Sequence, residues 1–320
     1  MTWLVWRQHR YEILGMLIGA LTVFAALVYG ADYAVRVRRE LGVDTCQPTP
    51  FTNFQCAMLA GQAADRIQAL RWLLLALLFL PAIVGSFIGG PLFARDLDRG
   101  THRLIWTQAI TRTRWATTKL LALCGVAALT TALVALVGNR AATINGSAAN
   151  AYSNFDLEGP ALVSYVVFAI VIAAFVGTLS RRILTGMFVG LLVFGIFRLG
   201  VELGLRPNYE PPITVLYSDA ARCPQCAVTD GAWVVSVDYI DRTGSVVTPQ
   251  RIRGLNNSFR PGPGRTDTVT YFAQNDAYQR VRFQPADRYW RFQWTEGFIF
   301  LALSGLFAFA TLQLVTRRDA

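Results

Sequence analysis

The sequence is poor in the residues on which most catalytic and phosphate-binding sites depend. Lys119 is the only lysine among 320 residues, and His9 and His102 are the only histidines. A P-loop needs a lysine behind a glycine-rich turn, because backbone N–H groups and the ammonium hold the phosphates together. Lys119 follows an alanine and two threonines, and the chain has no HExxH or Gly-x-Ser-x-Gly motif. We therefore expect a protein that is not an enzyme, with no catalytic residues and no metal site.

Charge is scarce as well, at 16% of residues, whereas hydrophobic residues make up 53%. Six windows of 18 to 23 residues contain almost no charge, which is the length that an α-helix needs to cross a bilayer core of about 30 Å. A soluble core helix rarely stays apolar on every face for that long. The sequence therefore predicts an all-α polytopic membrane protein with six transmembrane helices. The windows are 13–30, 72–93, 120–138, 161–179, 183–205 and 298–315.

The distribution of basic residues predicts the orientation. With the N-terminus inside, the inner segments hold 12 Arg and Lys residues and four acidic ones, whereas the outer segments 31–71 and 139–160 hold six basic residues. Because Arg and Lys near span ends accumulate on the cytoplasmic side, both termini are expected to be cytoplasmic. Topology thus explains the net charge of +10, and a nucleic-acid partner is not expected. The inner segments are 1–12, 94–119, 180–182 and 316–320.

Three regions follow from this topology. Residues 1–205 would contain transmembrane helices 1 to 5, preceded by an interfacial N-terminal helix or by an irregular start of the first span. Residues 206–296 would form a small mixed or β-rich extracytoplasmic domain between helices 5 and 6. Residues 297–320 would form the sixth helix and a cytoplasmic tail. The strand candidates in the outer domain are rich in β-branched and aromatic residues. They are 233–240, 245–248 after a turn at 241–244, 268–272 and 278–283.

The five cysteines divide by predicted location. Cys46, Cys56, Cys223 and Cys226 fall in outer segments, where disulfides can form, and Cys124 lies in the third span. Four cysteines allow three pairings, and the local sequence favours Cys46–Cys56 and Cys223–Cys226. The Cys223-x-x-Cys226 motif also fits a metal clip or a redox centre. A structural disulfide is favoured, because no βαβ pattern surrounds the motif and no second ligand pair is present.

One charged pair falls within a predicted span. Arg198 and Glu202 are four residues apart in the fifth helix, so their side chains can meet on one face. An ionisable pair inside a membrane is a functional candidate by default. The structural alternative, which we favour, is that both lie near the outer end of the helix and neutralise each other.

The predicted cytoplasmic loop 94–119 interleaves apolar residues with cations, as expected of a segment that lies on a membrane or docks on a partner. Its acidic-x-x-Gly-Thr-x-x-Leu…Thr-Arg…Lys pattern resembles the loop between the second and third helices of permease subunits of bacterial type-2 ABC exporters. Residues 283–296, with Gln-Pro-Ala-Asp-Arg-Tyr-Trp and a later Glu, are similar to a segment of actinobacterial members. The loop residues assigned to ATPase coupling are Asp96, Arg99, Gly100, Thr101, Arg103, Leu104, Ile105, Trp106, Thr107 and Arg112.

The resemblance implies a multi-pass protein of the bacterial cytoplasmic membrane. It would pair with a second permease subunit, of the same or a related chain, and with separate ATP-binding subunits. ATP and Mg²⁺ would bind those subunits, and this chain would carry no cofactor. The weakly charged membrane core suggests export of an amphiphilic or apolar cargo. One alternative is a membrane sensor or assembly factor whose outer domain binds a ligand or a protein. A thiol oxidoreductase using Cys223 and Cys226 is a more distant alternative.

Overall fold

The computed structural model describes residues 2–46, 53–98, 111–144, 151–217, 231–260 and 268–317. The chain divides into two compact units, and each is described by itself. The first, the helical unit, comprises Met1–Ser147, Asn154–Glu202 and Gln293–Ala320. The second, the sheet unit, comprises Ala148–Ser153 and Leu203–Phe292.

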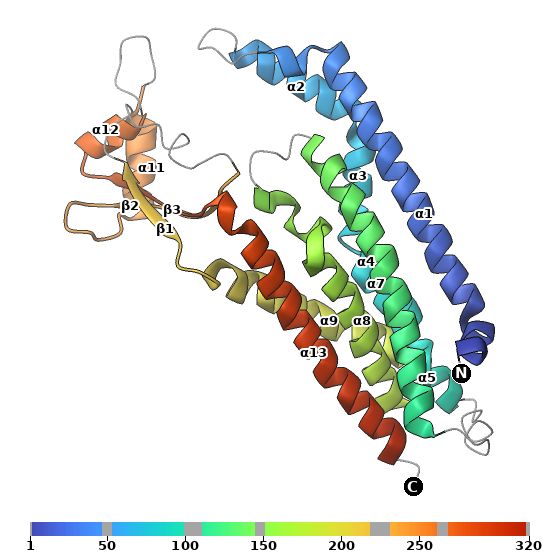
Figure 1. The fold of residues 1–320 in the computed structure, drawn as a ribbon. Coiled ribbons are helices and arrows are strands. Elements are labelled where there is room, and N and C mark those ends of the chain that lie inside the picture. Colours follow the sequence, from blue (N-terminus) through green and yellow to red (C-terminus); the bar gives the residue numbers. More distant parts are fainter. Residues whose placement is uncertain are drawn as a thin grey trace. The chain divides into compact units, whose positions relative to one another are not determined.

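Five helices of the described chain are each long and apolar enough to cross a membrane, and they run beside one another in Figure 1. Four of them each contain a predicted span, and α9 together with the π-turn η5 (Val201–Leu205) covers the span 183–205. The prediction of a mostly helical, multi-pass chain is therefore confirmed. Residues 2–12 continue into the first of these helices without a break. The five are α1 (Thr2–Glu40), α7 (Arg112–Ile144), α8 (Gly159–Ser180), α9 (Ile183–Gly200) and α13 (Tyr289–Arg317).

The remaining predicted span, 72–93, is a bent pair of helical segments. The segments 68–77 and 80–98 meet at 47°, and counting them as one span gives six. Pro81 lies in the first turn of the second segment, and a π-helical turn follows it. Pro81 accounts for the break between the segments, because proline lacks an N–H donor and its ring clashes with the carbonyl four residues earlier, that of Leu77. The segments are α3 (Gln68–Leu77), α4 (Leu80–Val84), the π-turn η2 (Gly85–Gly89) and α5 (Pro91–Asp98).

Glycines let this bent span approach its neighbours closely. A Cβ atom on Gly85 would lie 2.6 Å from the Cβ of Ala169 on α8, and one on Gly177 would lie 2.6 Å from the carbonyl oxygen of Gly90. Small residues allow such contacts between helix backbones in membranes. After the bend in the chain direction, α4 and η2 therefore pack on α8 and α9. Before the bend, α3 packs on α1.

Aromatic side chains attach α13 to α8 and α9. The ring of Phe300 lies 4.9 Å from that of Tyr165 and 5.3 Å from that of Phe168, both on α8. Phe307 contacts Phe168 and also Phe197 of α9. Edge-to-face packing of this kind stabilises a helix contact without close approach of the backbones.

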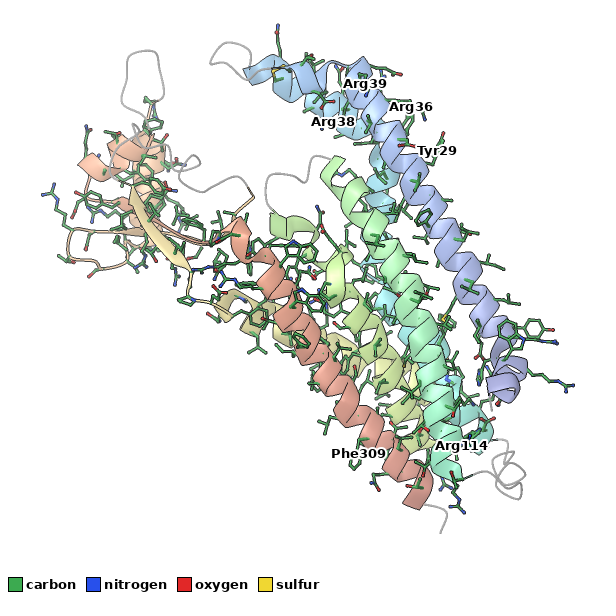
Figure 2. All side chains as sticks on the ribbon, in the orientation of Figure 1. Tyr29, Arg36, Arg38, Arg39, Arg114 and Phe309 are labelled. Carbon is green, nitrogen blue, oxygen red and sulfur yellow. A yellow bond between two sulfur atoms is a disulfide. The ribbon has the colours of Figure 1, made fainter. Side chains whose placement is uncertain are left out.

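The C-terminal end of α1 is basic, and an ion pair joins it to the short connection that follows. Figure 2 labels Arg36, Arg38 and Arg39 there, and the guanidinium of Arg38 lies 2.8 Å from the carboxylate of Asp44. Gly42 ends the helix with a φ of 69°, which glycine adopts at no steric cost. The chain continues through η1 (Val43–Thr45) to α2 (Asn53–Arg66).

The sheet unit contains a three-stranded antiparallel sheet in the order β1-β3-β2. Val281 of the central strand pairs with Val215 and with Val237, and it packs in a small core with Tyr217 and Phe283. The predicted strands 233–240 and 278–283 are confirmed. The elements of this unit are η6 (Arg206–Asn208), β1 (Ile213–Tyr217), β2 (Trp233–Ile240), α11 (Pro249–Ser258), α12 (Thr268–Gln274), β3 (Tyr278–Gln284) and η7 (Ala286–Arg288). Two more, η4 (Ala151–Leu157) and η5 (Val201–Leu205), each belong partly to the helical unit.

Two strand predictions in this unit are wrong. Residues 268–272 begin the helix α12, which buries Phe272 beside Tyr239 of β2, so tertiary packing overrides β-propensity. Residues 245–248 make one isolated bridge, and Thr248 instead caps α11. The predicted turn at 241–244 is present. Hydrogen bonds from the Thr243 hydroxyl and the Ser245 N–H hold the pKa of Asp241 below its usual value.

Candidate functional site

A buried ion pair closes the base of the predicted coupling loop. Asp96 lies in the last turn of α5 and Lys119 in the second turn of α7, on the two sides of the loop. The ammonium of Lys119 lies 2.6 Å from a carboxylate oxygen of Asp96, and these residues are 1% and 4% exposed. Buried charges are tolerated only when they are paired, so separating these two residues would cost a large amount of free energy.

Three helices converge on this pair. The amide of Gln8 on α1 donates to Asp96 at 3.1 Å. The Lys119 ammonium lies 5.3 Å from the ring of Trp115 and 5.8 Å from that of Phe93, within the range of cation–π attraction. The pair thus connects α1, α5 and α7. A displacement of α5 or α7, the two helices that flank the loop, therefore acts on all three helices.

A second ionic contact reinforces the junction of α1 with α5. The guanidinium of Arg95 lies 2.9 Å from the carboxylate of Glu12, whose other oxygen pairs with the His9 ring. Glu12 belongs to the long helix α1, and Arg95 directly precedes the buried Asp96. Sequence reasoning counted these residues only as inner-face charges. Their pairing depends on which helices become neighbours, and no local pattern encodes that.

Only the two ends of the proposed coupling site lie in the described chain. Asp96 forms the ion pair above, and Arg112 is the first residue of α7. The part of the site that would contact an ATPase therefore stays a prediction from sequence. The residues outside the described ranges are Arg99, Gly100, Thr101, Arg103, Leu104, Ile105, Trp106 and Thr107.

The predicted intramembrane pair belongs to a larger charge cluster in the helical unit. Arg198 lies 3.4 Å from Glu202, but it also lies 2.5 Å from Asp156 and 3.5 Å from Glu296. Its guanidinium stacks 4.3 Å from the ring centre of Tyr165, whose hydroxyl donates to Glu296 at 2.5 Å. One arginine therefore faces three carboxylates from three helical segments, and Glu296 is fully buried.

Sequence reasoning identified the least buried of these carboxylates. Glu202 was found because it is four residues from Arg198 on the same helix. A usable signal for Glu296 existed, since this carboxylate ends the 283–296 motif directly before the sixth predicted span. Asp156 precedes the fourth span with no comparable pattern.

The amide of Gln293 joins the same end of α13 to α8. It is fully buried, donates to the carbonyl of Phe155 at 2.7 Å and accepts from the backbone N–H of Ala161 at 3.2 Å. The N–H of Ala161 lies in the first turn of α8, where donors have no partner within the helix. Gln293 therefore replaces a cap that the sequence before α8 does not supply.

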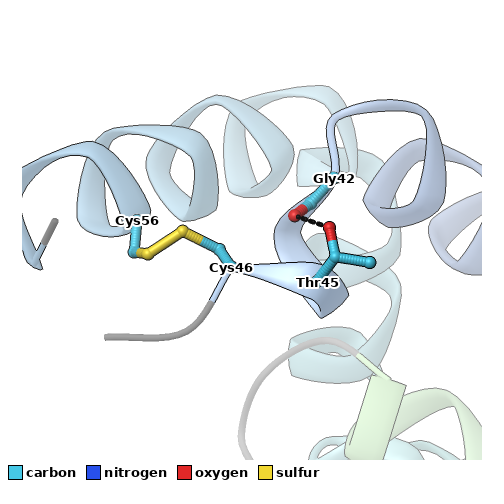
Figure 3. The surroundings of a disulfide bond; sticks show 4 residues. All are labelled: Gly42, Thr45, Cys46 and Cys56. Carbon is cyan, nitrogen blue, oxygen red and sulfur yellow. Dashed lines mark hydrogen bonds between the residues drawn. A yellow bond between two sulfur atoms is a disulfide. The ribbon is translucent and has the colours of Figure 1, made fainter. Parts of the chain in front are cut away.

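The cysteines are only partly described. Cys46 and Cys56 form a disulfide that joins the end of η1 to α2, as Figure 3 shows. Cys124 is a free, half-buried thiol on α7. Cys223 and Cys226 lie outside the described residues, so their pairing stays a prediction. Within the described ranges, no group of three or more His, Cys, Asp or Glu residues could hold a metal ion.

Comparison with known proteins identifies a family for this chain. A family model described as ABC-2 membrane transporter related matches residues 16–206, which run from within α1 to the end of the fifth span. No curated protein and no solved structure matches the chain significantly.

Proposed function

Because the chain belongs to the ABC-2 membrane transporter related family, we propose that it is the membrane-spanning permease subunit of a bacterial ABC exporter. It is a multi-pass membrane protein. In the proposed complex it pairs with a second permease chain and with separate ATPase subunits, which bind ATP and Mg²⁺. Both termini and the loop between α5 and α7 face the cytoplasm. The similarity of residues 283–296 to actinobacterial permeases supports this subgroup.

The buried Lys119–Asp96 pair carries the mechanistic part of the proposal. An ATPase that closes on ATP pushes the loop between α5 and α7. Since the ion pair and Gln8 hold both loop stems against α1, the push moves three helices as one body. Rigid-body movement of this kind is a common way to transmit a local change over a distance.

Within the loop, Trp106 is the proposed anchor in a groove of the ATPase. A large aromatic side chain in a pocket often contributes most of the binding energy of an interface. Leu104 and Ile105 add apolar contact, and Arg99 and Arg103 meet acidic residues of the groove. Thr101, which follows Gly100, would cap a short docking helix.

Trp106→Ala and Leu104→Ala test the docking proposal. Each is expected to reduce copurification of the ATPase and transport by at least about tenfold, since a hot-spot residue contributes about 2 kcal/mol or more. The measurement is the ATPase-to-permease ratio after purification of the complex. Trp72→Ala and Leu136→Ala are matched controls, because these side chains are 63% and 73% exposed on candidate spans and should leave the ratio unchanged.

Wild-type ATPase binding in both loop variants would show that this loop is not the main coupling site. Failure of any ATPase to copurify with the wild-type chain would favour the sensor or assembly-factor alternative. An amphiphilic or apolar cargo is proposed because the spans contain few charges, and Arg198 is paired within the helical unit.

A further inference from the structure

A groove of about 410 Å³ lies within the helical unit, between α1, the segment α4–η2 and α7. Its volume falls in the range of small-molecule sites. Its walls are almost entirely apolar. Representative lining residues are Gly15, Gly19 and Val23 of α1, Ile83 and Phe87 of the bent span, and Thr130 of α7.

The bend of the second span creates this groove. Before the bend α3 packs against α1, but after it α4 and η2 pack against α8 and α9 instead. Gly15 and Gly19 face the resulting space, and a Cβ atom added to either would meet no other atom within 4 Å. The groove is therefore a consequence of the bend before Pro81.

The groove opens toward the hydrocarbon of the bilayer. Ile83 and Phe87 line the groove and are 54% and 65% exposed. Both belong to a candidate membrane span, so their exposed surface would face lipid. The hydroxyl of Thr130 already donates to the carbonyl of Val126 at 2.9 Å, so it does not require a polar ligand. Water is a poor occupant of such a site, because a buried water needs two or more polar partners.

The groove is elongated along α1, as a hydrocarbon chain requires. From Glu12 to Val23 the wall of α1 is roughly 16 Å long at 1.5 Å per residue.

One end of the groove is polar. Glu12 lines that end and pairs with Arg95, whose side chain is 40% exposed and retains further N–H donors. The rest of the lining runs through apolar and small residues to Val134. We propose that the groove binds the hydrocarbon chain of a membrane amphiphile, with the polar head of that molecule beside Glu12 and Arg95. This site does not depend on the proposed export function, since the chain alone would form it.

Photolabelling of the chain alone tests the proposal. The full chain in phospholipid nanodiscs is irradiated with a phospholipid whose acyl chain carries a diazirine, and the labelled peptides are mapped by mass spectrometry. We expect the label to concentrate at least fivefold on residues 15–23, 80–88 and 127–134 relative to other bilayer-facing segments. Gly19→Phe should fill the groove and reduce this labelling at least fivefold.

Gly305→Phe is the matched control, because a Cβ at Gly305 of α13 also meets no atom within 4 Å and this glycine does not line the groove. It should leave the labelling unchanged. If the label is distributed uniformly over all bilayer-facing segments of the wild-type chain, the proposal is overturned without reference to any variant. Crosslinks from the groove residues to a second copy would overturn it as well. Loss of ATPase copurification bears only on the proposed function, because no ATPase is present in this experiment.

Discussion

At the scale of single residues, the position of the only lysine in the sequence gives it a structural role. Lys119 is almost completely buried, and its ammonium pairs with Asp96 and lies near two aromatic rings. The Gln8 amide donates to the same Asp96 carboxylate. Burial excludes it from any phosphate-binding role in this conformation. The residue that a search for nucleotide-binding motifs would single out therefore serves to join helices.

Lys119→Met should lower the free energy of unfolding by about 3–5 kcal/mol, because it removes the buried cation that pairs with the buried carboxylate of Asp96. The double variant with Asp96→Leu should cost clearly less than the sum of the two single changes. Unfolding of the purified chain in detergent measures both effects. Arg114→Met is the control, since Arg114 is exposed on the same helix (Figure 2) and should change stability by less than about 0.5 kcal/mol. Additive effects of Lys119 and Asp96 would contradict the ion-pair interpretation.

At the scale of elements, the cluster around Arg198 determines how helices meet. Arg198 comes from α9, Glu296 from α13, Tyr165 from α8 and Asp156 from the turn before α8. Arg198 therefore joins three helical segments, whereas its sequence spacing from Glu202 suggests only a pair within one helix. The buried carboxylate of Glu296 depends on it, whereas the Glu202 side chain is 37% exposed and keeps access to its surroundings.

The two members of the predicted pair should differ strongly when they are replaced. Arg198→Met removes the guanidinium that pairs with Asp156 and with the buried Glu296, and it should lower the free energy of unfolding by about 3–5 kcal/mol. Glu202→Gln should cost less than about 1 kcal/mol, the range of a partly exposed pair. Thermal unfolding of each variant, monitored by intrinsic fluorescence, provides the comparison. Normal stability of Arg198→Met together with lost transport would favour a direct role in transport instead.

At the scale of the whole molecule, the proposed division of labour places all nucleotide chemistry on another subunit. The chain has no P-loop sequence, and its single lysine is enclosed by the helical unit. The purified chain is therefore expected to bind no fluorescent ATP analogue and to hydrolyse no ATP. A preparation that retains the ATPase subunit is the positive control. Turnover that persists after complete removal of that subunit would contradict the proposal.

The sequence by itself determined that the chain crosses a membrane several times and where its long apolar helices lie, because crossing a hydrocarbon core requires a long apolar segment, and segment length is a local property. It also located β2 and β3, whose β-branched and aromatic residues suit a sheet. It failed at 268–272, where similar residues form α12, since the neighbours of that segment decide its structure.

Only the tertiary structure decided which charges meet and where space remains. Lys119 and Asp96 are separated by 23 residues, Gln8 and Asp96 by 88, and Arg198 and Glu296 by 98. These contacts depend on which helices become neighbours and at what rotation. The groove depends on the 47° bend, since the bend moves the second span from α1 to α8 and α9. Helix packing is set by the shapes of facing surfaces, and a single segment of sequence contains only one of the two surfaces.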